Sequence, residues 1–390
     1  MLIGIDASRA VAARPTGTEV YSQRLLSALL ELGSSHRFRF YLREAPPTDA
    51  FPLAELRVIP LPRLWSHLRL SWELLRHRPD VLFVPAHVLP LAHPAPSVVT
   101  IHDLGYLHFP ETHPWQQRLY LDASTRWSAR HAHHLLADSQ ATKADLVSYY
   151  HVAADRVTVA YPGVDPALAP VRRPERIAEA KARYGITGDY LLYLGTLQPR
   201  KNLQRLIEAY AALLETQGEG APNLVLAGRL GWLYDELFTR AARLGLAGRV
   251  HFCGYVAEEH KAALLSGARA FVFPSLYEGF GLPVLEAQAC GCPVLTSDTS
   301  SLPEAAGEGA LLVAPGDMAA IAAGLARLVA DGDLGRSLAA RGLENVRRFS
   351  WGACARTVLA TLEHAAGLGG DLDGEPAAAV ERYHKRRARR

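Results

Sequence analysis

Short apolar runs and longer segments with helical periodicity alternate along the whole chain. In the first half, the runs predicted as strands are Leu2–Asp6, Phe38–Leu42, Val81–Pro85, Val98–Asp103 and Leu135–Asp138. The helices predicted between them are Thr18–Leu32, Leu64–Arg76, Trp115–His131 and Gln140–Tyr150. Several runs are apolar at every position, as strands are when helices cover both faces of a parallel sheet. The pattern therefore predicts an α/β domain.

The same alternation restarts in the second half. Its predicted strands are Tyr190–Gly195, Asn223–Gly228, Val250–Gly254, Ala270–Pro274, Pro293–Thr296 and Leu311–Val313. Its predicted helices are Leu203–Glu215, Tyr234–Leu244, Glu259–Ser266, Leu282–Ala289, Asp317–Leu328, Leu334–Phe349 and Trp351–His364. A second α/β domain with its own parallel sheet is expected.

A stretch rich in proline, glycine and arginine, residues 161–174, separates the two sets and is typical of an interdomain linker. We place the boundary near residue 170, so that the first domain covers residues 1–170 and the second covers residues 171–349. We expect the last helix, residues 350–365, to return to the first domain. Residues 366–390 are predicted to form a disordered basic tail.

Composition agrees with a soluble, two-domain globular enzyme. The chain has 390 residues, of which 49% are hydrophobic and 21% are charged. The four cysteines lack zinc-like spacing with other ligands, so we expect them to be reduced core residues and expect no metal site. The N-terminus has no pattern of an export signal, and no apolar run is long enough to span a membrane. We expect a cytoplasmic protein.

The net charge of +3 conceals an uneven distribution. Residues 381–390 carry six Lys/Arg and one Glu, or +5, which leaves −2 for the other 380 residues. The body of the protein is therefore not a nucleic-acid binder by charge. The tail either contacts anionic lipid, at the inner face of the membrane, or RNA weakly, or is simply a solvated end.

Two motifs follow predicted strands of the second half, where ligands bind in open parallel sheets. In the first, Gly195 to Asn202, the cations Arg200 and Lys201 stand at a strand-to-helix turn and could pair with a diphosphate. The alternative is a loop with two solvated cations. No Gly-x-Gly-x-x-Gly pattern follows a predicted strand, so the dinucleotide-binding hypothesis loses its usual support.

The second motif runs from Pro274 to Glu286 and contains two carboxylates, Glu278 and Glu286. Glycines 279 and 281 allow a ligand to approach the backbone, and Pro283 suits the first turn of the following helix. Carboxylates placed there could accept hydrogen bonds from sugar hydroxyls and stabilise charge at an anomeric carbon. Alternatively, the two acids only complement a helix dipole.

The first half offers further candidates. Gly17 precedes an amphipathic helix and either approaches a phosphate or sugar or belongs to a plain capping turn. His102 ends an apolar strand, with the adjacent Asp103 able to orient it, although a lone histidine is often structural. Trp65, Leu68, Trp72 and Leu75 repeat at helical spacing, which fits either a membrane-surface helix or packing on the domain core.

Together these motifs resemble the family 4 glycosyltransferases, which are retaining enzymes of the GT-B fold. The resemblance rests on Glu278 and Glu286 with seven residues between them, on Arg200-Lys201 after a Gly-Thr strand end, and on an ordered set of weaker matches. The weaker matches are Gly17, His102-Asp103, Ala137-Asp138-Ser139 and the segment Tyr161-Pro-Gly-Val-Asp165. One departure concerns the acceptor side, because many members have two glycines where this chain has only Gly17, and because no Arg follows Gly17 closely.

The resemblance implies a role for each of these positions. Arg200 and Lys201, with Gly17, would bind the donor diphosphate, Glu286 would bind the ribose, and Glu278 would face the donor sugar. The backbone amides of Phe280, Gly281 and Leu282 would meet the sugar or phosphate, and Gly254, Tyr255 and Val256 would bracket the base. His102 would contact the transferred sugar from the opposite domain, across a cleft. These enzymes need no bound metal and no cofactor other than the nucleotide sugar.

The implied activity is transfer of a hexose, with retention of configuration, from a nucleotide-diphosphate sugar to a glycan or lipid-linked acceptor. The amino-acid sequences of the two motifs are similar to those of bacterial mannosyltransferases, which favours GDP-mannose over a UDP-sugar as the donor. Two alternatives stay open on the sequence. One is a nucleotide-sugar epimerase of the same fold, and the other is a nonenzymatic protein that binds a membrane surface.

Overall fold

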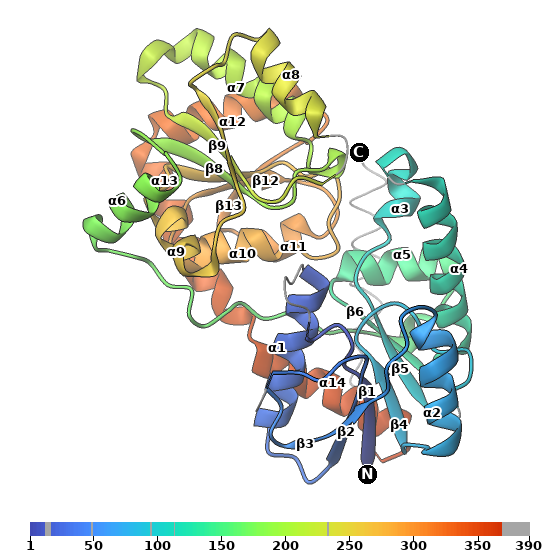
Figure 1. Ribbon diagram of the computed structural model, residues 1–390. Coiled ribbons are helices and arrows are strands. Elements are labelled where there is room, and N and C mark those ends of the chain that lie inside the picture. The colour runs from blue at the N-terminus through green and yellow to red at the C-terminus, as the bar shows by residue number, and fades with distance from the viewer. Residues whose placement is uncertain (12–16, 48–49, 94–95, 113, 232–233, 369–390) are drawn as a thin grey trace. The chain divides into compact units, whose positions relative to one another are not determined.

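The computed structural model describes residues 1–11, 17–47, 50–93, 96–112, 114–231 and 234–368. The chain divides into two compact units (Figure 1). Unit 1 contains Met1–Gly163 together with the chain from Ser350 onward, and unit 2 contains Val164–Phe349. The predicted basic tail lies outside the described residues from position 369. Among the described residues, no helix is both long enough and apolar enough to cross a bilayer.

Unit 1 is built on a seven-stranded sheet in the order β3-β2-β1-β4-β5-β6-β7, and every strand pair is parallel. Its strands are β1 (Leu2–Asp6), β2 (Arg37–Leu42), β3 (Ala54–Val58), β4 (Val81–Val84), β5 (Ser97–Ile101), β6 (His134–Ala137) and β7 (Val157–Val159). Because every strand runs the same way, all of their carboxyl ends lie along one edge. Side chains that follow the strands are therefore gathered at that edge.

Helices cover both faces of this sheet. The larger ones are α1 (Gly17–Glu31), the π-helical turn η1 (Trp65–Leu70), α2 (Ser71–Arg76), α4 (Trp115–His131), α5 (Gln140–Tyr150) and α14 (Trp351–Ala365). Short helical turns are α3 (Gly105–His108), η2 (Pro110–Thr112) and η3 (Ala154–Arg156). Alternate residues of each strand face opposite sides, so Phe83 packs with α1 and α14, whereas Leu82 packs with η1, α2, α4 and α5.

Unit 2 repeats the design with a six-stranded parallel sheet in the order β10-β9-β8-β11-β12-β13. Its strands are β8 (Tyr190–Leu194), β9 (Asn223–Ala227), β10 (Val250–Gly254), β11 (Ala270–Phe273), β12 (Val294–Ser297) and β13 (Ala310–Val313). Its α-helices are α6 (Pro174–Arg183), α7 (Leu203–Gln217), α8 (Asp235–Arg243), α9 (Glu258–Gly267), α10 (Leu282–Ala289), α11 (Leu302–Ala306), α12 (Met318–Ala330) and α13 (Gly332–Asn345). Three 3-10 turns complete the described elements: η4 (Pro199–Lys201), η5 (Gly218–Gly220) and η6 (Val346–Arg348).

The sequence pattern predicted most of these elements and overlooked some short or polar ones. The strand β3 has the sequence Ala-Glu-Leu-Arg-Val and lies at the sheet edge, where its side chains are mostly exposed and need not be apolar. The helix α6 begins at Pro174, inside the segment interpreted as a linker, because proline suits the first turn of a helix. The chain passes from unit 1 to unit 2 at Gly163–Val164, compared with the expected boundary near residue 170.

Candidate functional site

Lys201 and Glu278 meet inside unit 2 at the carboxyl edge of its sheet. Lys201 belongs to η4, which follows β8, and Glu278 follows β11, the strand next to β8 in the sheet. The Lys201 Nζ donates a hydrogen bond of 2.6 Å to Glu278 Oε1, and both side chains are only 10% exposed. Two motifs separated by 77 residues in the sequence therefore form one buried cluster.

Arg200 and Ser275 complete this cluster, which we call the cation cluster. The Arg200 Nη1 lies 3.7 Å from Glu278 Oε2 and donates to the Tyr277 carbonyl at 2.8 Å, while Ser275 Oγ donates to Glu278 Oε1. Burial alone would raise the pKa of Glu278, but the charges of Lys201 and Arg200, with the hydrogen bonds, lower it. An ionised carboxylate thus stands between two cations, and arginine and lysine side chains placed in this way can also bind an anion such as a phosphate.

The loop that carries Glu278 is held in place by serines from the neighbouring strand and its following loop. Ser301 Oγ donates to the carbonyls of Glu278 and Phe280, at 2.9 and 2.8 Å, and Ser297 Oγ donates to the Ser275 carbonyl at 2.7 Å. These bonds fix the backbone that leads into α10. The positions of Phe280, Gly281 and Leu282 are therefore determined by the protein before any ligand arrives.

Gly281 occupies a backbone conformation that favours glycine. Its φ is +112°, and a Cβ there would lie 2.9 Å from Cδ2 of Leu302. Leu282 then begins α10, so free amide groups of the first helical turn lie directly after Gly281. The start of this eight-residue helix is where the sequence predicted contacts to a sugar or phosphate.

Glu286 forms an ion pair with a different cation, Lys261. It lies on α10, and its Oε1 is 3.2 Å from Nζ of Lys261 on α9, which also contacts Glu258 Oε2 at 2.8 Å. Burial raises the pKa of Glu286, and the charge of Lys261 opposes that increase. The two acids of the motif therefore occupy different electrostatic environments, Glu278 beside two cations and Glu286 beside a lysine shared with another acid.

Three adjacent strands of unit 2 end in glycine. In the sheet order these are Gly254 after Phe252 and Cys253 of β10, Gly228 after β9, and Gly195 after β8. The Gly228 amide donates to the Gly254 carbonyl at 2.7 Å, and the Gly195 amide donates to the Ala227 carbonyl at 2.9 Å. A Cβ on Gly228 would lie 1.9 Å from the Gly195 carbonyl oxygen, so this glycine permits close approach of two strand ends. A Cβ on Gly254 would meet no atom within 4 Å, so the strand end at Gly254 borders open space.

The predicted base-binding segment continues from this edge. Tyr255 is exposed, Val256 is buried, and the guanidinium of Arg229 lies 5.1 Å from the Tyr255 ring centroid. Sequence reasoning overlooked Gly228 and Arg229. They repeat the pattern of the first motif, a buried strand followed by glycine and then a basic residue, and that repetition is the signal that could have identified them.

His102 lies in unit 1 at the ends of three adjacent strands. It follows β5, and its neighbours Pro85 and Asp138 follow β4 and β6. The Nδ1 atom of His102 is 2.7 Å from Asp138 Oδ2, and Nε2 is 2.9 Å from the Pro85 carbonyl. The Pro85 carbonyl can only accept, so Nε2 carries a proton. With Asp138 ionised, Nδ1 carries a proton as well and the ring is an imidazolium, although burial raises the pKa of Asp138.

The charge of His102 agrees with its surroundings. Burial tends to lower the pKa of the imidazole, but Asp138 and the Pro85 carbonyl outweigh burial and raise it. The carboxylate that contacts Nδ1 is Asp138, while the adjacent Asp103 accepts a hydrogen bond from the Gly105 amide at 2.9 Å and contributes its charge to the raised pKa of His102. Asp138 is 36 residues away in the sequence, and only the adjacency of β5 and β6 brings it to the ring.

A second histidine supports the first. The backbone amide of His102 donates to Nε2 of His87 at 3.0 Å, so His87 carries its proton on Nδ1. Burial, together with the nearby charge of His102, lowers the pKa of His87 to about 4. His87 is therefore neutral at physiological pH, and its Nε2 accepts the hydrogen bond from the backbone amide of His102 at the end of β5. No pattern in the sequence indicates His87 as a site residue.

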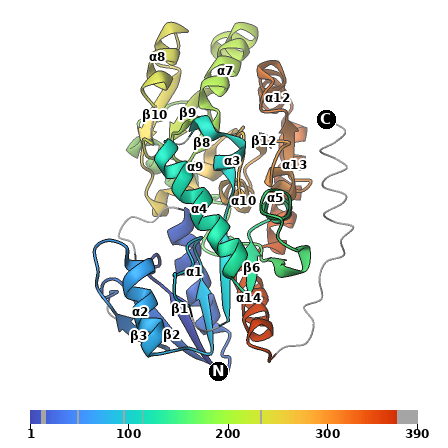
Figure 2. The same ribbon diagram turned by 90° about the vertical axis from the view of Figure 1, so that its right-hand side faces the viewer.

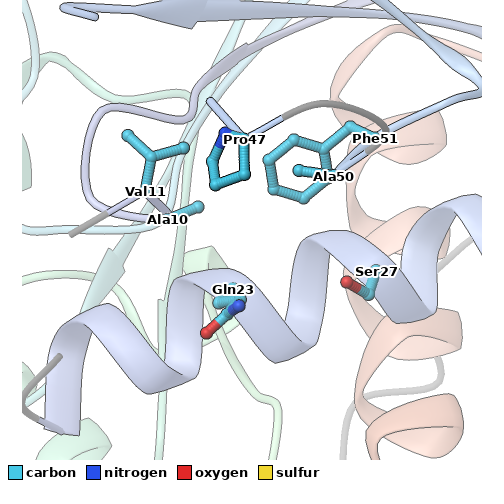
Figure 3. A pocket seen from close by; sticks show the side chains of 7 residues that line it. All are labelled: Ala10, Val11, Gln23, Ser27, Pro47, Ala50 and Phe51. Carbon is cyan, nitrogen blue, oxygen red and sulfur yellow. The ribbon is translucent and has the colours of Figure 1, made fainter. Parts of the chain in front are cut away.

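Gly17 opens α1, and a Cβ at this position would meet no other atom within 4 Å. Arg9, which follows β1, donates to Glu19 Oε1 in the first turn of α1 at 2.9 Å. Arg9 therefore contacts the first turn of the helix that Gly17 opens, although Arg9 precedes Gly17 in the sequence and does not follow it. A hollow of about 220 Å³ lies beside the same helix. Figure 3 shows side chains that line it, among them Gln23 and Ser27 on the helix and Pro47 and Phe51 opposite them. None of the predicted site residues lines this hollow.

The structure thus brings some of the predicted site residues together in two sets, and each set lies within one unit. Arg200, Lys201 and Glu278 form the cation cluster of unit 2, and His102 with Asp138 forms an ion pair in unit 1. The described residues hold no group of three or more His, Cys, Asp or Glu side chains placed to bind a metal ion.

Comparison with known proteins covers both units. The sequence model described as "Glycosyltransferase Family 4" matches residues 15–168, and the model described as "Glycosyl transferases group 1" matches residues 177–345. The O-antigen chain mannosyltransferase B of Escherichia coli is 34% identical over 293 residues, which cover 75% of this chain and 76% of that protein. The serotype-specific mannosyltransferase WbdA of Escherichia coli is 33% identical over 231 residues, which cover 58% of this chain and 28% of WbdA.

The fold has solved counterparts. The structure of Anabaena Alr3699/HepE in complex with UDP and glucose superposes with a TM-score of 0.73 at 20% identity, covering 93% of this chain and 99% of that one. Two parallel-sheet α/β units with such a counterpart define the GT-B fold, as the sequence predicted.

Proposed function

Because this chain belongs to the family 4 glycosyltransferases and is a hexosyltransferase, we propose that its donor is a nucleotide-diphosphate sugar. GDP-mannose is the favoured donor, with a UDP-sugar as the other candidate. The acceptor is a glycan or a lipid-linked sugar, and transfer retains the anomeric configuration. The names of the two Escherichia coli relatives, both mannosyltransferases, support a mannosyl donor.

The observation that carries the proposal is the cation cluster around Glu278. Breaking the bond between the sugar and the diphosphate leaves negative charge on the departing phosphate oxygens. Lys201 and Arg200 together offer two positive charges on rigid, buried side chains, so they stabilise that charge without reorganising at the moment of reaction. The diphosphate would replace Glu278 as the direct partner of Lys201.

Glu278 has a separate duty in this mechanism. Its lowered pKa keeps it ionised, so it accepts hydrogen bonds and does not act as an acid. We assign it to the donor sugar, where it would accept a hydroxyl hydrogen bond and oppose positive charge that develops at the anomeric carbon. The amides of Phe280, Gly281 and Leu282 would donate to the sugar or phosphate from the start of α10.

The nucleotide would occupy the glycine-ended strands of the same unit. Glu286 would accept hydrogen bonds from the two ribose hydroxyls, with Lys261 holding its carboxylate in place. Gly254, Tyr255 and Val256 would bracket the base, and a Cβ on Gly254 would meet no atom within 4 Å, so this position leaves space for it.

His102 is proposed to contact the transferred sugar without exchanging protons. Both of its ring protons are donated to acceptors of unit 1, so the imidazolium has no lone pair with which to act as a base. Its contribution would be a fixed positive charge and a defined position at the strand end. Likewise, we propose that no metal is needed, since Arg200 and Lys201 supply the charge that a metal would otherwise supply.

The donor is tested by thermal shift with GDP, GDP-mannose, UDP and UDP-glucose, followed by a transfer and hydrolysis assay with each sugar nucleotide. Stabilisation by GDP and GDP-mannose, with activity unaffected by EDTA, is expected. A clear shift with UDP and none with GDP would overturn the assignment of the base. Isomerised sugar nucleotide in the absence of any acceptor would indicate an epimerase.

A further inference from the structure

The loop that follows β4, residues 85–89, holds His102 at two points. The Pro85 carbonyl accepts a hydrogen bond from Nε2 of the His102 ring at 2.9 Å, and Nε2 of His87 accepts one from the His102 backbone amide at 3.0 Å. A backbone amide needs an acceptor, and at this strand end a histidine side chain supplies it. One short loop therefore fixes both the side chain and the main chain of His102.

The loop is itself anchored on α4. Ser128 is fully buried, and its Oγ donates to the His87 carbonyl at 2.6 Å and accepts from the Leu89 amide at 3.2 Å. Figures 1 and 2 show α4 along one face of the seven-stranded sheet, and Ala129 of this helix belongs to the same core cluster as Leu89. The main chain of His87 therefore cannot shift without breaking hydrogen bonds to a packed helix.

One nitrogen of the His87 ring lacks a partner. Because Nε2 accepts from the amide, Nδ1 carries the proton, and this atom is buried with no hydrogen-bond partner among the residues that the structure describes. A buried donor without a partner is unfavourable, so the ring is not there for stability alone. Its polar contribution within the described part of the chain is the hydrogen bond to His102.

Every polar atom of His102 has a partner in unit 1. Asp138 and Pro85 contact its ring nitrogens. Thr142 Oγ1 donates to its carbonyl at 3.3 Å, and His87 accepts from its amide. The His87 ring also packs on the His102 ring, with 5.4 Å between the centroids. His87 thus contacts both the main chain and the ring of His102, which suits it to set the orientation of both.

We propose that His87 is a positioning residue for the transfer reaction, and that its hydrogen bond to the backbone amide sets where the His102 ring stands beside the transferred sugar. The inference rests on the proposed contact between His102 and that sugar. His87 acts through His102 and does not contact the sugar itself. A shift of about 1 Å at a residue that contacts a reacting group can cost roughly a hundredfold in rate, so one hydrogen bond at this point is enough to matter.

The effect should fall on the rate and leave donor binding unchanged. The diphosphate and the nucleotide are assigned to residues of unit 2, whereas His87 and His102 lie in unit 1. Losing the acceptor of the His102 amide should therefore lower kcat and leave the KM for the donor nearly unchanged.

Three substitutions in the full-length protein separate the hydrogen bond from the rest of the side chain. In His87→Gln the side-chain oxygen can still reach the His102 amide, in His87→Asn it ends one bond too short, and in His87→Leu it is absent. Hydrolysis of GDP-mannose, or of the sugar nucleotide that the donor assay identifies, is expressed per molecule that binds GDP or the matching nucleotide. The rate should fall about tenfold to a hundredfold in the leucine and asparagine variants. The glutamine variant should recover most of the rate.

NMR reports the contact directly. In protein with isotopically labelled histidine, the backbone amide signal of His102 is assigned by its loss in His102→Asn. The amide proton should move to higher field in the leucine and asparagine variants of His87, as expected when a hydrogen bond is lost. It should return toward its wild-type position in the glutamine variant.

His93→Leu is the matched control. His93 lies further along the same connection between β4 and β5, and its Nδ1 donates to the Pro90 carbonyl at 2.8 Å, not to His102. This variant should keep the kcat and the His102 amide signal of the wild type. The melting temperature of each variant is measured alongside, so that loss of the fold is not mistaken for loss of position.

Wild-type turnover in His87→Leu, with the reaction impaired in His102→Asn, would overturn the inference. A glutamine variant no better than the asparagine variant would also overturn it, because the hydrogen bond would then not be what His87 contributes. Normal turnover in His102→Asn would instead contradict the proposed contact of His102 with the sugar, and the inference with it.

Discussion

The Nζ of Lys201 and the Oε1 of Glu278 are 2.6 Å apart, and each side chain is only 10% exposed. Neither residue can be considered alone, because each is the main counter-charge of the other in a low-dielectric setting. Binding of a diphosphate beside Lys201 must therefore change the environment of Glu278 as well. In the proposed mechanism, the same pair would link leaving-group stabilisation to the position of the carboxylate assigned to the sugar.

We predict that Lys201→Met destabilises the protein and abolishes transfer. Removing the cation leaves the Glu278 carboxylate buried beside Arg200 at 3.7 Å and Ser275, which compensate it only in part. The expected loss of unfolding free energy is about 3 kcal/mol, the lower end for an unpaired buried charge. Urea denaturation measures this loss, and a transfer assay under folding conditions measures activity.

The double variant Lys201→Met/Glu278→Gln is the matched control for that prediction. It removes both charges, so part of the lost stability should return while activity stays absent. Equal stability of the single and double variants would mean that the pair is not coupled. Near-normal transfer by Lys201→Met would remove Lys201 from the donor site.

Lys261 and Glu286 should affect donor affinity more than the rate of the chemical step. Their side chains are 3.2 Å apart, on α9 and α10, and neither belongs to the cation cluster. In Lys261→Met, the pKa of Glu286 should rise further, because burial already raises it and the opposing charge is gone. The expected result is a higher KM for the donor, at a modestly changed kcat, that worsens as the pH is lowered.

The control for this effect is Glu258→Gln, which removes the other partner of Lys261 and leaves the contact with Glu286 in place. Its KM should stay close to the wild-type value. A fall in kcat without a change in KM for Lys261→Met would contradict a role in holding the nucleotide. Steady-state kinetics at several pH values distinguish the two outcomes.

The His102–Asp138 pair should make stability depend on pH in a defined direction. Asp138 raises the pKa of His102 against the effect of burial, so the folded state binds the imidazole proton more tightly than the unfolded chain does. The stabilisation is then fully present below about pH 6.5, the ordinary pKa of histidine, and is lost as the pH rises through the folded pKa.

The variant Asp138→Asn should remove this dependence. Urea unfolding from about pH 6 to about pH 9 should show a stability difference between wild type and variant that is largest at the acid end. NMR titration of His102 should show a lower pKa in the variant. If the two proteins lose stability in parallel across this range, the imidazolium assignment is wrong.

The outcome for the segment from Leu64 to Arg76 shows what sequence periodicity can and cannot decide. Helical spacing predicted a single stripe containing Trp65 and Trp72, but Trp65 is buried and Trp72 is exposed on the other side. The π-helical turn η1, which precedes α2, changes the angle between successive residues, so positions at regular spacing no longer share one side. The spacing of apolar residues in the sequence does not reveal this change from a π-helical to an α-helical turn.

The candidate site shows the same division between local and non-local information. Glu278 and Lys201 were predicted as site residues because each follows a buried strand, and that inference needs only local pattern. Their contact with each other depends on β8 and β11 being adjacent, which the order of strands along the chain does not reveal. For the same reason, the sequence indicates Asp103, the adjacent acid, as a partner of His102 and gives no sign of the contact with Asp138.

The return of the chain to unit 1 can be tested at a single glycine. A Cβ on Gly163 would lie 2.1 Å from the backbone N of Trp351 and 2.5 Å from the backbone C of Ser350, where no side-chain rotation can relieve the clash. Gly163→Ala should therefore displace the start of α14 from its position against α1 and lower the unfolding free energy by about 3 kcal/mol. The melting temperature should fall by roughly 6–12 °C. Amide hydrogen exchange should accelerate across residues 351–365 before it does elsewhere, since α14 is the element displaced.

Gly316→Ala is the control, because its added Cβ meets nothing within 4 Å. It should leave the unfolding free energy, the melting temperature and the exchange of α14 unchanged. Unchanged protection of α14 in the Gly163 variant would mean that the helix does not depend on this contact for its place in unit 1.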